Sequence, residues 1–236
     1  MSQEEPDKDK PGEVGFPSLS YSSIKEILSC PHKFYLRKVE GVEPTTSPAM
    51  RVGSAVHHAI ATWWKERDIG RVADELTTFI DFETFQKAWP LVSRYIAELG
   101  HLEPVLIEQE LEKEFEGIKV RGFVDLVLPG DKVVEIKTTS GGASKFIATA
   151  HADWQPAMYA WLLGWEEIAV EYHVIDTKRS DVLVLVSERT KEDIENVENL
   201  IRVASRIVRQ GDYPAMPGRQ CQWCGVRAYC KFFVTR

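Results

Sequence analysis

Apolar and polar residues alternate with two different periods along the chain. Up to about Gly100, apolar residues recur every three to four positions, as in "SLSYSSIKEILSC" and "MRVGSAVHHAIATWWKERD", which predicts amphipathic helices. From Glu103 they alternate or run together in "PVLIEQELEKEF", "IKVRGFVDLVL" and "KVVEIKTT". This second pattern predicts three consecutive antiparallel strands, with turns at Gly117 and at residues 129–131.

The rest of the chain returns to mixed signals. "DWQPAMYAWLLGW" predicts a short apolar helix, "IAVEYHVIDTK" and "DVLVLVSE" predict two strands, and "TKEDIENVENLIRVASRIVRQG" predicts an amphipathic helix that ends at Gly211. The order of these elements predicts an α/β fold with one mixed central sheet flanked by helices.

A chain of 236 residues is long enough for one such domain with a proper core. We expect residues 1–16, which are charged and contain proline, to form a disordered tail. A single domain would follow over residues 17–236, with a helical part (17–100), a core (101–210) and a cysteine-rich tail (211–236).

The overall charge limits the partners of this protein. The net charge is −7, from 29 basic and 36 acidic residues, which argues against a protein that coats nucleic acid without specificity. Two groups of basic residues are typical of solvated helix faces. The first group is Lys25, Lys33, Arg37 and Lys38, and the second is Arg202, Arg206 and Arg209. No apolar run reaches the roughly 18 residues that span a bilayer, and the N-terminus lacks the apolar core of a signal peptide. We therefore expect a soluble, cytoplasmic protein without membrane contact.

Three charged residues lie inside the predicted strands. Burying an unpaired charge is costly, so Asp125, Glu135 and Lys137 need compensation. The turn at residues 129–131 brings Asp125 close to Glu135, and two such carboxylates suit a Mg²⁺ or Mn²⁺ ion between them. Lys137 would orient and deprotonate a water, or stabilise the negative charge that develops on an attacked phosphodiester. The alternative is a buried ionic network with a purely structural role.

The four cysteines form one pattern, with Cys30 near the start and Cys221, Cys224 and Cys230 in "CQWCGVRAYC". This spacing is poor as a disulfide framework in a chain without export signals. Four thiolates satisfy either tetrahedral Zn²⁺ or a [4Fe-4S] cluster, and the spacing does not decide between them.

The aspartate followed ten residues later by Glu-x-Lys resembles the PD-(D/E)XK nuclease superfamily, and specifically its RecB-like branch. Asp125 matches the branch's first acidic position in a "G-x-x-D" form that begins at Gly122. "VGSAVHHAI" resembles the helical motif that ends in a metal-ligating histidine, here His57. "QPAMY" resembles the Q-x-x-x-Y motif, with Gln155 and Tyr159 one helical turn apart.

The resemblance implies a restriction-endonuclease-like core and a metal-dependent DNA exonuclease that prefers single-stranded DNA with a free end. His57, Asp125, Glu135 and the backbone carbonyl of Ile136 would hold Mg²⁺ or Mn²⁺, and Lys137 would be catalytic. Gln155 and Tyr159 would position the phosphate or the displaced strand. Glu108 or Glu110 is a candidate outer carboxylate, and the hydroxyls of Thr138, Thr139 and Ser140 are candidate phosphate donors.

The cysteines resemble a RecB-like subgroup that carries an iron–sulfur cluster, which includes CRISPR-associated adaptation nucleases and helicase-linked nuclease subunits. This implies a [4Fe-4S] cluster on Cys30, Cys221, Cys224 and Cys230 that ties the C-terminal tail to the first helix. The resemblance is also consistent with a protein partner in recombination, repair or CRISPR adaptation. Two other hypotheses are a catalytically silent DNA-binding or assembly subunit, and a zinc-stapled regulatory protein.

Overall fold

A mixed six-stranded sheet forms the centre of the computed structural model, which describes residues 18–233. The tail expected over residues 1–16 lies outside the described residues. The strands run in the order β1-β3-β4-β5-β6, and β2 also pairs with β3. Their bounds are β1 (Leu19–Ser20), β2 (Leu106–Phe115), β3 (Ile118–Leu128), β4 (Lys132–Thr139), β5 (Ile168–Asp176) and β6 (Asp181–Arg189).

The sheet confirms the predicted α/β class with a mixed sheet. Strands β2, β3 and β4 form the expected antiparallel meander, β5 lies parallel to β4, and β6 returns antiparallel to β5. The sequence pattern missed β1, a strand of two residues that pairs in parallel with β3 through Leu19 and Val120. So short a strand leaves no alternation that could be recognised.

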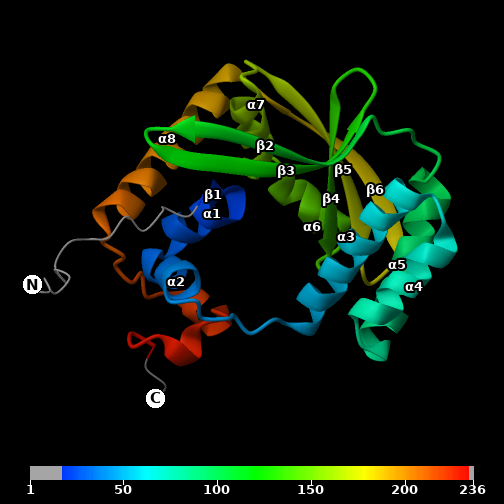
Figure 1. Cartoon of the computed structure of the whole chain (residues 1–236), viewed down its shortest axis with the longest axis horizontal. Coiled ribbons are helices and arrows are strands. Elements are labelled where there is room, and N and C mark those ends of the chain that lie inside the picture. The colour runs from blue at the N-terminus through cyan, green and yellow to red at the C-terminus, as the bar shows by residue number, and fades with distance from the viewer. Residues whose placement is uncertain (1–17, 234–236) are drawn as a thin grey trace, which may run out of the picture.

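Helices cover both faces of the sheet (Figure 1). One apolar core joins the sheet to α1, α7 and α8, and the other joins it to α3, α4 and α5. The helix bounds are α1 (Tyr21–Ser29), α2 (Pro31–Phe34), α3 (Pro48–Glu66), α4 (Ile69–Phe79), α5 (Phe82–Leu99), α6 (Ala143–Ala150), α7 (Gln155–Leu163) and α8 (Lys191–Gln210). A π-helical turn at Tyr35–Val39 and two 3₁₀ turns at Arg219–Trp223 and Arg227–Tyr229 complete the elements. Helix α6, which follows the end of β4, was not predicted.

Local signals explain where the helices begin and end. The Ser20 side chain accepts the Ser23 N–H at 3.2 Å and starts α1, and Ser47 does the same for α3 through the N–H of Met50. Helix α8 ends at Gly211 as predicted, because this residue takes the left-handed conformation (φ 65°) that glycine adopts without strain.

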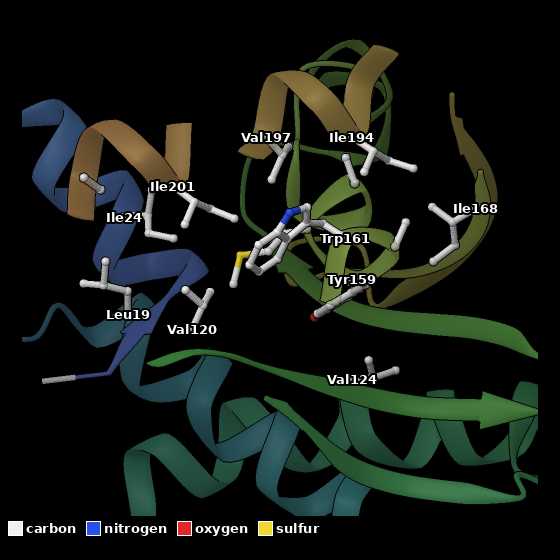
Figure 2. Packing of buried hydrophobic residues seen from close by; sticks show 14 of the residues in the cluster. Leu19, Ile24, Val120, Val124, Tyr159, Trp161, Ile168, Ile194, Val197 and Ile201 are labelled. Carbon is white, nitrogen blue, oxygen red and sulfur yellow. The ribbon is translucent and has the colours of Figure 1, made fainter. Parts of the chain in front are cut away.

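Helix α7 is apolar all round because it lies between the sheet and α8. Tyr159 and Trp161 are buried there, and Figure 2 shows them between β3 and α8. Gly122 of β3 permits the close approach, since a Cβ atom at this position would lie 2.9 Å from Leu162 Cδ1 and 3.3 Å from Tyr159 Cε1. This packing of α7 fixes the positions of those of its side chains that face β4.

We expect Gly122→Ala to destabilise the protein by about 1–3 kcal/mol, because the added methyl group overpacks the contact between β3 and α7. Urea unfolding measures this loss. Combining Gly122→Ala with Leu162→Ala removes the atom nearest to the new methyl, so the double variant should lose less stability than the sum of the single variants. A Gly122→Ala protein as stable as the wild type would contradict the tight packing.

Candidate active site

The candidate site lies where β3 and β4 part. Their antiparallel ladder runs from Leu128↔Lys132 to Leu126↔Val134, and Asp125 follows at the point where it ends. The Asp125 carboxylate accepts the backbone N–H of Ile136 at 2.6 Å. A side-chain carboxylate therefore takes the role of a strand carbonyl, which satisfies the Ile136 N–H while β3 turns away from β4.

Glu135 is the centre of a hydrogen-bond network between β4 and α7. Its carboxylate accepts Lys137 Nζ at 2.7 Å and Gln155 Nε2 at 2.8 Å on one oxygen, and its other oxygen lies 2.5 Å from the Tyr159 hydroxyl. Lys137 Nζ also donates to Gln155 Oε1 at 2.7 Å. The structure thus brings four of the residues predicted for the site into direct contact.

Burial raises the pKa of both carboxyls. It raises the pKa of Asp125 to about 6, and the pKa of Glu135 to about 7, where the charge of Asp125 adds to the effect. Burial alone would lower the pKa of Lys137, but the carboxylate of Glu135 outweighs it and raises this pKa above its usual value. Lys137 therefore stays protonated in this arrangement, which suits the stabilisation of negative charge better than the removal of a proton.

Helix α3 brings His57 toward the same site. Burial lowers the pKa of this imidazole, and the charges that act on it belong to Glu135, Lys137 and Glu108. The close approach of α3 to β4 requires Gly53, because a Cβ atom there would lie 2.8 Å from Thr138 Oγ1. His57 lines an open pocket together with five hydroxyl-bearing residues, namely Ser54, Thr138, Thr139, Ser140 and Thr177.

Glu108, rather than Glu110, lies beside Asp125. The β2–β3 register, with Ile107 opposite Leu126 and Gln109 opposite Val124, places Glu108 across from Asp125. Its charge raises the pKa of Asp125, its backbone has φ 49°, and its carboxylate forms an ion pair with Lys65 of α3. By the same register Glu110 lies opposite Phe123, one step farther from the site.

Asp153, which lies two residues before Gln155, was not predicted from the sequence. Its carboxylate accepts the Tyr21 hydroxyl at 2.6 Å, the Tyr172 hydroxyl at 3.0 Å and the Gln155 N–H at 3.2 Å. Its charge also contributes to the raised pKa of Lys137. An acidic residue just before a helix is a known start signal and could have drawn attention to this position.

Several members of the basic groups are engaged in ion pairs. Lys33 and Arg37 both contact Glu26, at 3.0 Å and 2.9 Å. On α8, Arg202 and Arg209 both contact Glu116, at 3.0 Å and 2.5 Å. These contacts agree with the interpretation of the basic groups as charged helix faces.

The four cysteines line one pocket, which residues 30–36 and residues 215–233 form together, and no disulfide joins them. The described part of the C-terminal tail, residues 211–233, packs beneath α2 (Figure 1), where the His32 N–H donates to the Pro214 carbonyl at 3.2 Å. Four free thiols facing one pocket have the donor chemistry of a four-thiolate metal or cluster site. In residues 18–233 the side chains of Cys, His, Asp and Glu form no group of three or more that is already arranged around a metal position.

Both buried carboxylates of the candidate site also have suitable chemistry for a divalent cation. Asp125 and Glu135 supply oxygen ligands, and His57 supplies an imidazole that burial keeps neutral.

Across the described part of the chain, none of the helices is long and apolar enough to cross a membrane.

Comparisons with solved structures agree with this fold. A candidate exonuclease from Eubacterium rectale superposes with a TM-score of 0.64 at 13% identity, covering 100% of this chain and 96% of that one. An alkaline exonuclease from Laribacter hongkongensis gives a TM-score of 0.46 at 12% identity, covering 82% and 89%. A phage-related exonuclease from Haemophilus somnus 129PT gives 0.40 at 16% identity, covering 83% and 95%. The first of these superpositions supports a shared fold.

No curated protein matches the sequence. The family comparison is more direct, since residues 18–231 match the description "PD-(D/E)XK nuclease superfamily". This match spans every strand of the sheet, the network around Glu135 and all four cysteines. The chain therefore belongs to the PD-(D/E)XK nuclease superfamily.

Proposed function

We propose that this protein is a metal-dependent DNA exonuclease that acts on single-stranded DNA with a free end. The observation that carries the proposal is the contact of a protonated lysine with a buried glutamate beside a second buried carboxylate, at the point where two strands part. Such a cluster is costly to bury without a function. The family membership favours phosphodiester hydrolysis as that function.

The residues that would hold Mg²⁺ or Mn²⁺ are Asp125, Glu135, His57 and the carbonyl of Ile136. When bound, the ion polarises the scissile phosphate and lowers the pKa of an attacking water. Lys137 supplies a fixed positive charge for the phosphate oxygens. Gln155 and Tyr159 hold the Glu135 carboxylate in one orientation through their hydrogen bonds at 2.8 Å and 2.5 Å, which preorganises the site.

The cysteine pocket would hold a [4Fe-4S] cluster on Cys30, Cys221, Cys224 and Cys230. Zn²⁺ is the alternative that the four thiols also accept. Anaerobic purification separates the two, because an iron–sulfur protein is brown whereas a zinc protein is colourless. In either case the group is structural, since the pocket lies beneath α2 rather than at the strand opening.

A second candidate function is a catalytically silent DNA-binding or assembly subunit, at work in the cytoplasm in recombination, repair or CRISPR adaptation. The thiol pocket favours it, because a metal or cluster that links Cys30 to the C-terminal cysteines would stabilise a partner-binding surface as well as it would stabilise an enzyme. The network around Glu135 argues against it, since a silent subunit has no need to keep a buried charged cluster.

We expect Lys137→Ala to reduce DNA degradation by on the order of 10²–10³-fold, because it removes the positive charge beside the phosphate. Anaerobically purified protein is incubated with end-labelled single-stranded DNA in Mn²⁺, Mg²⁺ or EDTA. The matched control is Lys132→Ala, which removes a half-exposed lysine from the other end of β4. Equal inertness of the wild type and Lys137→Ala, with DNA binding intact, would leave the silent subunit as the better proposal.

A further inference from the structure

Phe123 is an exposed aromatic residue in the middle of the β2–β3 ribbon. Along β3 the residues Gly122 and Val124 are buried, whereas Arg121 and Phe123 on the opposite face are exposed. Phe123 is 51% exposed, and it belongs to neither of the two apolar cores among the described residues. Packing therefore does not account for a phenylalanine at this position.

The position of Phe123 is fixed relative to the candidate site. Its backbone carbonyl lies 2.7 Å from the Tyr159 hydroxyl, the same group that contacts Glu135. Asp125 lies two residues farther along β3, and two residues of a strand span roughly 7 Å. The backbone of Phe123 is therefore held beside the candidate site, two residues along the strand from the carboxylate that would hold the metal.

The charges around the ring are paired with one another and give no net attraction for a phosphate. Glu110 lies opposite Phe123 in the register, and Arg121 contacts Glu110 at 3.7 Å. Glu108, the next outward residue of β2, is paired with Lys65. The two glutamates and the two basic residues neutralise one another, so these four charges give a phosphate no net attraction, whereas an uncharged base can stack on the ring without an ionic partner.

We propose that Phe123 is a stacking platform for an unpaired DNA base next to the scissile phosphate, an inference that rests on the proposed nuclease function. Every base has a π face that stacks on an aromatic ring, and such a contact contributes about 1–3 kcal/mol per base. In a duplex the neighbouring bases cover these faces. The platform thereby selects single-stranded DNA without reading its sequence.

The test uses short single-stranded DNA with one 2-aminopurine at successive positions, bound in Ca²⁺. We expect wild-type protein to quench the probe at one position, and Phe123→Leu to abolish the quenching and weaken binding by about fivefold or more. Phe123→Trp should retain both, because an aromatic ring is restored. Phe82→Leu is the matched control, since it makes the same change at an exposed phenylalanine (74%) at the start of α5.

An abasic scan adds a readout from cleavage. In Mn²⁺, a single abasic residue at the stacked position should slow wild-type degradation by the same factor as Phe123→Leu, and it should not slow Phe123→Leu further. The stacking role would be overturned if Phe123→Leu quenched the probe as the wild type does. It would also be overturned if, at every position, an abasic residue slowed Phe123→Leu as much as it slows the wild type. Failure of wild-type cleavage in all metals would instead reject the proposed nuclease function, while the quenching still decides the role of Phe123.

Discussion

In EDTA at pH 8, the Asp125→Asn protein is expected to unfold at a higher temperature than the wild type, and with Mn²⁺ or Mg²⁺ present its nuclease activity should be lower than that of the wild type by on the order of 10²–10³-fold. The gain arises because burial disfavours the ionised forms of the Asp125 and Glu135 carboxyls, and because the charge of Asp125 raises the pKa of Glu135 further. Asparagine keeps an oxygen that accepts the Ile136 N–H. The variant therefore loses a charge and a proposed metal ligand but keeps the local hydrogen bond.

The pH dependence of this effect follows from the direction of the pKa shift. Burial raises the pKa of Asp125 from 3.8 to about 6 in the folded protein. The unfolded chain releases this proton at lower pH, so wild-type stability in EDTA falls as the pH rises from about 4 through 6 and stays lower above it. The difference from Asp125→Asn should reach about 1–3 kcal/mol at pH 8 and vanish near pH 4.

Thermal unfolding at several pH values, with and without Mn²⁺, measures these differences. Mn²⁺ should stabilise the wild type and leave Asp125→Asn unchanged, because only the wild type keeps the full set of proposed ligands. Asp131→Asn, an exposed aspartate in the β3–β4 turn, serves as the control. A lower unfolding temperature for Asp125→Asn in EDTA would show instead that Asp125 belongs to a stabilising ionic network.

Cys221→Ala is expected to lower the unfolding temperature by roughly 6–12 °C. A group held by Cys30 and Cys221 closes a loop of nearly the whole chain, and a crosslink of such length restricts the unfolded state by about 3 kcal/mol or more. The tail keeps few other anchors on the described body, among them buried Val226 and the hydrogen bond from Thr45 N–H to the Gly225 carbonyl at 2.9 Å.

Thermal unfolding under anaerobic conditions, together with the visible absorbance of the protein, measures the effect of Cys221→Ala. Gln222→Ala is the matched control, because it changes an exposed neighbour without removing a thiol. We expect the control to keep both the colour and the unfolding temperature of the wild type. An unchanged unfolding temperature in colourless Cys221→Ala would contradict a structural cluster.

The sequence by itself determined the class of the fold and most of its elements. Period-two alternation in "IKVRGFVDLVL" and "KVVEIKTT" located β3 and β4 because one face of each strand must meet a core. The unusual charges of Asp125, Glu135 and Lys137 identified the candidate site, since such residues are rarely placed in buried strands without a partner. Short elements with weak periodicity, namely β1 and α6, could not be predicted.

Only the tertiary structure decided which groups meet. Asp153 joins the network because the folding of α7 onto β4 brings it near Lys137, and no local pattern encodes that distance. Glu108 was distinguished from Glu110 by the β2–β3 register, and Phe123 became a candidate because its strand face is left uncovered. The physical reason is that local periodicity fixes the face on which a residue lies, whereas its neighbours are set by the packing of distant segments.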